Sequence, residues 1–246
     1  MKHNTLLAIV ALGTALAATS YSTLLAQQAA APAGRGGGAA APAPPKARPT
    51  LVWREDWKEP PQPPDPDAVA TQQSVGNPNL ELKTYGPGAT ASEKGSHLVI
   101  TGAANNPQNP THVWTGLCSA NCALTLRDKN NFVDLTGQAK ARWVTKVSGF
   151  QKIHPIVKLA DGTMYAGDWA DGMTNDWHET EFYFSELHWI KMDPARAVTV
   201  GAPVEKVDLS KVDEFGWSDF MNASGHGQGG WADVGKIELY GKAVPR

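Results

Sequence analysis

The chain has 246 residues, with 22 basic and 24 acidic side chains, and 41% of its residues are hydrophobic. A net charge so close to zero, without a long basic cluster, argues against nucleic acid as a partner. Its 18 prolines and 24 glycines argue against a helical bundle and favour strands joined by loops.

Residues 1–26 have the pattern of a secretory signal peptide. A short basic start is followed by an apolar run over 6–18 and then by small residues. That run is shorter than the roughly 20 apolar residues that a transmembrane helix needs. We therefore expect a secreted or periplasmic protein with no membrane span in the mature chain. An uncleaved N-terminal anchor is the alternative.

Residues 27–50 are rich in alanine, proline and glycine and offer almost no apolar side chains for burial. Such a composition is typical of a disordered linker. The remaining residues, 51–246, have the length of one β-sandwich domain.

Alternating apolar and polar residues predict the strands of this domain. An Asp161-Gly162 pair between two such runs supplies the positive φ angles of a tight hairpin turn. Short helices are tolerated only over 65–73 and 185–188. About eight or nine strands result, which is enough for two packed antiparallel sheets. The predicted strands are 96–101, 122–127, 139–147, 153–160, 163–166, 177–184, 197–200, 207–217 and 230–241.

The two cysteines of the chain, Cys118 and Cys122, are separated by three residues. In an exported protein such a pair is most simply a small disulfide loop. Metal binding by the pair would require two further soft ligands at suitable spacing, and the sequence offers none. A disulfide between Cys118 and Cys122 is therefore predicted.

Several of the nine tryptophans lie in polar, loop-like segments. Sugars present apolar C–H faces that stack on aromatic rings, while neighbouring polar groups orient their hydroxyls. Core packing is the alternative for Trp169 and Trp231, and it is expected for Trp143 and Trp217 on their predicted strands. The candidate ligand-binding residues are Trp114, Asp168, Trp169, Asn175, Trp177, His226 and Trp231.

The segment 168–179 contains the candidates for catalysis. Two carboxylates about 5–10 Å apart across a cleft would suit glycoside hydrolysis, whereas carboxylates that point into solvent would rule it out. A secreted polysaccharide-active, glycosidase-like hydrolase is therefore an alternative to a binding protein. A third possibility is a structural or assembly domain whose aromatic loops contact another protein. The carboxylates concerned are Asp168, Asp171, Asp176 and Glu179.

Four segments resemble, in their order, the galactose-binding-like jelly-roll domains. This group includes many carbohydrate-binding modules and the intermediate-associated protein family of complex I assembly. The resemblance implies an all-β jelly-roll sandwich that binds carbohydrate. The matching segments are 133–137, 177–184, 207–216 and 237–241, and 51–57 corresponds to the opening strand.

In such domains an acid on the first strand and another near the last often share a structural calcium ion. The resemblance therefore implies Glu55, Asp56 and Asp233 as candidate ligands. The family pattern places an acid two residues before Ile237, and here the chain departs from it with Gly235. No other cofactor is expected.

These patterns together predict an exported jelly-roll β-sandwich that binds a glycan without catalysis. We expect the protein to be a monomer, with a carbohydrate as its partner.

Overall fold

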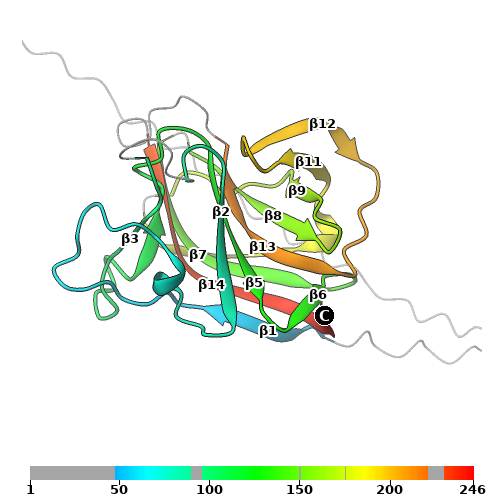
Figure 1. Ribbon diagram of the computed structural model, residues 1–246, viewed down its shortest axis with the longest axis horizontal. Coiled ribbons are helices and arrows are strands. Elements are labelled where there is room, and N and C mark those ends of the chain that lie inside the picture. Colours follow the sequence, from blue (N-terminus) through cyan, green and yellow to red (C-terminus); the bar gives the residue numbers. More distant parts are fainter. Residues whose placement is uncertain (1–47, 90–95, 150, 175, 221–229) are drawn as a thin grey trace, which may run out of the picture. The chain divides into compact units, whose positions relative to one another are not determined.

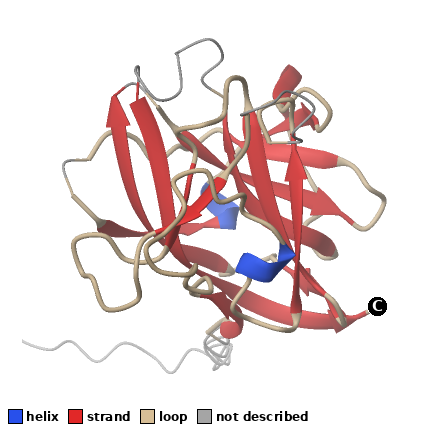
Figure 2. Ribbon diagram, turned by 60° about the vertical axis from the view of Figure 1, so that its left-hand side comes forward, coloured by secondary structure: helices blue, strands red, loops and turns tan. Residues whose placement is uncertain are grey.

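The computed structural model of the chain describes residues 48–89, 96–149, 151–174, 176–220 and 230–246. Within these ranges the chain forms fourteen strands and two short 3-10 turns, Gln72–Ser74 and Phe184–Glu186 (Figure 2). The predicted signal peptide, 1–26, and all but the last three residues of the predicted linker lie outside the described residues. In these ranges, no helix has both the length and the apolar composition that a membrane span requires.

The first of two layers is centred on the C-terminal strand. Its hydrogen-bonded order is β10–β7–β14, and the other edge of β14 pairs with β4 and then with β1. Strand β3 extends the layer beyond β4. The strands are β1 (Thr50–Glu55), β3 (Val99–Thr101), β4 (His112–Trp114), β7 (Lys140–Gly149), β10 (His178–Tyr183) and β14 (Gly230–Pro245).

The second layer has the order β2–β5–β13–β8–β9–β11–β12, with the short strand β6 paired to one end of β13. Every pairing in both layers is antiparallel. The strands are β2 (Leu80–Tyr85), β5 (Cys122–Asp128), β6 (Asn131–Asp134), β8 (Ile153–Leu159), β9 (Met164–Gly167), β11 (Trp189–Asp193), β12 (Val198–Val204) and β13 (Val212–Asp219).

Strand β14 belongs to both layers. Its residues from Gly230 to Tyr240 pair with β7, and its residues from Lys242 to Pro245 pair with β6 (Figure 1). Gly241 lies at the change of layer, where an added Cβ would come 2.7 Å from the carbonyl oxygen of Asp134. A glycine is required here because the two backbones approach too closely for a side chain.

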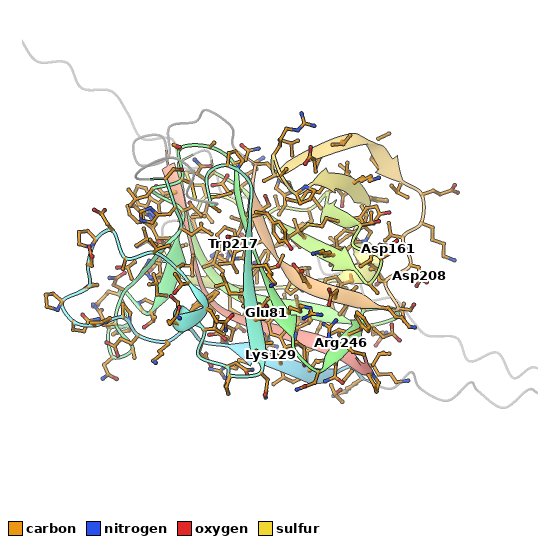
Figure 3. The ribbon with its side chains drawn as sticks, viewed as in Figure 1. Glu81, Lys129, Asp161, Asp208, Trp217 and Arg246 are labelled. Carbon is orange, nitrogen blue, oxygen red and sulfur yellow. The ribbon has the colours of Figure 1, made fainter. Side chains whose placement is uncertain are left out.

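The core between the layers is aromatic. Trp143 and Trp217 are fully buried, which confirms their predicted core positions, and Figure 3 shows Trp217 well inside the strands while Asp161 and Asp208 lie at the periphery. Phe215 of the second layer lies 6.4 Å from Phe182 and 6.1 Å from Trp53 of the first, measured between ring centroids. These rings are the main contacts that join the two layers.

The all-β, two-layer antiparallel architecture agrees with the prediction, but the predicted strand count is wrong. Fourteen strands replace eight or nine: β2, β4, β6 and β11 were not predicted, and β1 was expected only from the resemblance. Three of these have five residues or fewer, too short for alternation to stand out from a loop. The predicted hairpin is present as β8 and β9, with Gly162 at φ 88° in its turn.

A buried carboxylate at the end of β1 fixes the following segment against β14. Glu55 is fully buried, and its oxygens accept hydrogen bonds from the backbone N–H groups of Trp57, Gly76 and Asn77 at 2.7, 2.7 and 3.0 Å. Trp57 has a φ of 57°, and its indole N–H donates to the carbonyls of Val234 and Gly235 at 2.9 and 2.6 Å. These carbonyls belong to a bulge in β14 between Val234 and Ile237. Glu55 therefore fixes Trp57, and Trp57 fixes the bulge.

Replacing Glu55 with glutamine should destabilise the fold, because one buried backbone N–H loses its acceptor, a loss of about 1–3 kcal/mol. Burial raises the pKa of Glu55 above its ordinary value, even though three N–H donors act against the rise. The native protein then binds this proton more tightly than the unfolded chain does. The contribution of Glu55 to stability is therefore full at acid pH and is lost as the pH rises through the raised pKa.

Urea unfolding between about pH 4 and about pH 7 tests this linkage. The difference in free energy of unfolding between the natural protein and Glu55→Gln should shrink with rising pH. Glu59→Gln, at an exposed site on the same segment, is the control for loss of a carboxylate and should change the free energy of unfolding little. A difference for Glu55→Gln that grows with pH would contradict the assignment.

Candidate functional site

Three predicted tryptophans lie on the outer face of the first layer, at one end. Asp233 of β14 pairs with Trp114 of β4 and with Lys146 of β7, and Trp231 lies two residues earlier on β14. Directly paired residues and their i+2 neighbours point to the same side of a sheet. The inward positions between them, such as Ala232 and Val234, are fully buried.

Trp177 joins this group from the segment that precedes β10. Its ring meets the ring of His112 edge to face, with 5.1 Å between centroids. Its indole N–H donates to the carbonyl oxygen of Gln108 at 3.2 Å. All three tryptophans are half-buried, so part of each side chain is accessible. We name Trp114, Trp177, Trp231, His112 and Asp233 the tryptophan end.

A buried imidazole and a buried carboxylate lie beneath these rings. His112 is 3% exposed and Asp233 is 6% exposed, and Nε2 of His112 lies 3.3 Å from Oδ1 of Asp233. Nδ1 of His112 is 2.6 Å from the carbonyl oxygen of Pro110, so its proton is donated there. The hydrogen bond to Pro110 fixes the orientation of the imidazole, and the imidazole in turn supports Trp177.

A cavity of about 360 Å³ opens beside the bulge of β14. Gly235 forms part of its wall because it has no side chain: an added Cβ would come 3.7 Å from Cζ3 of Trp177 and 3.4 Å from the carbonyl oxygen of Val144. The cavity is lined by Asp56, Trp57, Ala104, Pro110, Thr111, Val144, Gly235 and Lys236. It therefore adjoins the tryptophan end, and its lining includes an acid and a lysine.

Other predicted ligand-binding residues lie elsewhere. Trp169 packs on the core, with its ring centroid 5.9 Å from that of Trp143 and 4.8 Å from that of Phe182. Asp168 is exposed and binds Nδ1 of His188 at 2.8 Å. Asn175 and His226 lie outside the described residues.

The four carboxylates considered for hydrolysis have separate partners. Asp171 is buried on the inner face of the first layer, where it binds Nε2 of His178 at 3.0 Å and accepts hydrogen bonds from Thr145 at 2.7 Å and Trp143 at 3.1 Å. The other three are exposed: Asp168 binds His188, Asp176 accepts from the backbone of Trp177, and Glu179 binds Lys236. Asp171 thus fastens its loop to the layer, apart from the other acids.

The carboxylates considered for calcium also have separate partners. The carboxylate oxygens of Glu55 accept hydrogen bonds from three backbone N–H groups. Asp56 pairs with Arg54 at 2.6 Å, and Asp233 lies against His112. Among the described residues no three His, Cys, Asp or Glu side chains gather as metal ligands. Calcium requires six to eight oxygens, and these residues as arranged do not supply them. A calcium ion stays a prediction of the resemblance alone.

The sequence patterns did not point to a second polar cluster, on the outer face of the second layer. Glu214 is 2% exposed and accepts hydrogen bonds from Thr125, Tyr85 and Lys158 at 2.5, 2.7 and 2.9 Å. Burial, with the carboxylate as a neighbour, raises the pKa of Tyr85 to about 12. The alternation of β13 indicates that Glu214 shares a face with Ser218, but only the structure shows that three donors satisfy it.

Cys118 and Cys122 are both buried thiols in this structure, so the predicted disulfide is not confirmed. Burial and the neighbouring thiol of Cys118 raise the pKa of Cys122. The side chains are therefore in contact, and the disulfide stays a prediction.

Comparisons with known proteins identify no family. No protein-family model matches the sequence, and neither does any curated protein. Among solved structures, the chain is similar to the family 11 carbohydrate-binding module of a cellulosomal cellulase of Clostridium thermocellum, with a TM-score of 0.41 and 12% identity over 76% of this chain and 95% of that one. It is also similar to a family 29 carbohydrate-binding module complexed with cellulohexaose, with a TM-score of 0.33 and 12% identity over 67% of this chain and 93% of that one.

A third similar structure is that of an exo-beta-agarase, with a TM-score of 0.39 and 9% identity over 69% of this chain and 24% of that one. Scores this low carry no argument about function, which has to come from the site itself.

The cysteine pair gives a test that needs no ligand. We expect the protein, purified from an oxidising compartment, to lack two hydrogen atoms relative to the reduced chain, because adjacent thiols there form a disulfide. Intact-mass measurement before and after reduction checks this, with Cys118→Ser as the control that should show no such difference. After reduction, burial should keep Cys122 unreactive towards alkylation until the protein unfolds. Two free thiols in the never-reduced, denatured protein would contradict the disulfide.

Proposed function

We propose that the chain is an exported, non-catalytic carbohydrate-binding protein whose glycan lies on the tryptophan end. The observation that carries the proposal is the convergence of Trp114, Trp177 and Trp231 on one outer face. They come from three segments that are far apart in the sequence, and each is only half-buried. A group of rigid, half-buried rings suits the apolar C–H faces of sugars.

Polar groups for the sugar hydroxyls stand close to the rings. Asp56 and Lys236 line the adjoining cavity. Lys146 stands in register with Asp233 and has no ion-pair partner in the part of the chain that the structure describes. A sugar stacked on the tryptophans would therefore meet both donors and acceptors at its edge. The buried imidazole of His112 acts by positioning Trp177.

Binding without catalysis is favoured by the separate partners of the carboxylates in 168–179. Hydrolysis requires two carboxyl groups on opposite sides of one bond, whereas Asp171 is buried on the inner face and the other three acids are exposed. Export is supported by the pattern of residues 1–26.

Replacing Trp177 or Trp231 with alanine should weaken glycan binding by about tenfold or more, because loss of an aromatic anchor costs on the order of 1.4 kcal/mol or more. Calorimetry and affinity electrophoresis against a panel of soluble glycans measure the effect. Phe132→Ala removes a half-buried aromatic ring from β6, on the second layer, and should bind like the natural protein. Absence of binding to every glycan of the panel would refute the proposed function.

Filling the cavity gives an independent prediction. The Cβ of Gly235→Leu would lie at ordinary contact distances from Val144 and Trp177. We expect the rest of the side chain to enter the cavity and the fold to tolerate it. Glycan affinity should fall by at least about tenfold through the lost volume, with an unfolding midpoint close to that of the natural protein. Unchanged affinity in a folded Gly235→Leu variant would exclude the cavity from the binding site.

A further inference from the structure

The outer face of the first layer has a second aromatic row at its opposite end. Lys140 of β7 pairs with Tyr183 of β10 on one side and with Tyr240 of β14 on the other. Its ammonium lies 5.8 Å from the centroid of the Tyr183 ring and 5.2 Å from that of Tyr240. Lys140 and Lys146 are six residues apart on β7, which places the two aromatic rows about 20 Å apart.

The residues between the two rows neutralise one another. Arg142 lies 3.0 Å from Glu181 and 3.6 Å from Glu238, and Lys236 lies 2.7 Å from Glu179. These cations are engaged by glutamates of the same face. The middle of the face is therefore polar but electrically balanced, which suits a path for sugar hydroxyls more than a site for a charged group.

Unpaired cations occur at the two ends. Lys146 stands at the tryptophan end, and Arg48 and Lys242 stand beside the tyrosine row, none of them with an ion-pair partner among the described residues. Arg48 and Gln138 line a cavity of about 330 Å³ together with Tyr183 and Tyr240. Arg48 and Gln138 also line a second cavity of about 300 Å³, which reaches Lys242.

This arrangement matches the chemistry of an acidic sugar ring. Each tyrosine is half-buried and offers part of a ring for stacking. The guanidinium of Arg48 is a planar fork that binds a carboxylate through two parallel hydrogen bonds, and Gln138 adds an amide for hydroxyl groups. A neutral sugar would offer the guanidinium of Arg48 no carboxylate.

We propose that the ligand of this face is an extended polysaccharide that contains uronic acids. Its chain lies along β7 and β14 from the tryptophan end to the tyrosine row, where Arg48 binds a carboxylate. This inference rests on the proposed function, because the tryptophan end would bind the other end of the same polysaccharide. It adds the length of the ligand and the class of its sugars.

Calorimetry with short and long oligogalacturonates and oligomannuronates tests the inference. Each long oligosaccharide is compared with its carboxyl-reduced counterpart, which has the same length and linkage but no charge. At least one long acidic chain should bind about tenfold or more tightly than its short form and than its reduced form. Arg48→Gln should remove the preference for the acidic form while leaving the tighter binding of long chains. Arg196→Gln, an exposed guanidinium on the turn between β11 and β12, is the matched control and should change neither.

Two results would overturn the inference in distinguishable ways. In the first, acidic and reduced chains bind equally, Arg48→Gln has no effect, and Trp231→Ala loses glycan affinity. This result refutes an acidic ligand and leaves the proposed function intact. Binding of no glycan at all, acidic or neutral, refutes both. Because Arg48 precedes β1 and is exposed, its replacement should not disturb folding.

Discussion

The structure depends on one strand that serves two layers. Strand β14 is bonded to β7 along its first part and to β6 along its last, and it changes layer at Gly241. Strand β1, the first strand of the described residues, pairs with the same strand. The two layers are therefore held together by backbone hydrogen bonds as well as by the aromatic core, and the outer face of the first layer is organised around β14.

A chain of buried contacts shapes that face. Three backbone N–H groups bind Glu55, Trp57 is thereby kept at a positive φ angle, and its indole binds the carbonyls of the bulge in β14. The bulge brings Gly235 into the wall of the cavity beside Trp177. Gly235, where the family pattern has a metal-binding acid, thus lines the cavity instead. Glu55, the buried carboxylate that would have shared the metal, binds backbone N–H groups.

The sequence-based predictions were correct for features set by interactions between near neighbours in the chain. They missed features that depend on contacts between distant segments. Alternation over 139–147 predicts the inward face of β7, and an Asp161-Gly162 pair predicts a hairpin, because both effects act between near neighbours in the chain. The three-residue strand β4 has no such signal and exists because β14 pairs with it. His112, which supports Trp177, was missed for the same reason. Trp169 and Trp177 both lie in polar segments, yet one packs on the core and the other reaches the surface.

The sequence by itself determined the class of this protein: strands in place of helices, two packed layers, and tryptophans in numbers that suit sugar binding. Periodicity and composition report which side chains must be buried, and that suffices for the class. Only the tertiary structure decided which tryptophans share a face, that Asp171 is buried while its neighbouring acids are exposed, and that two aromatic rows stand at opposite ends of one sheet. These facts depend on register between strands far apart in the chain, where a shift of one residue would turn each side chain to the other face.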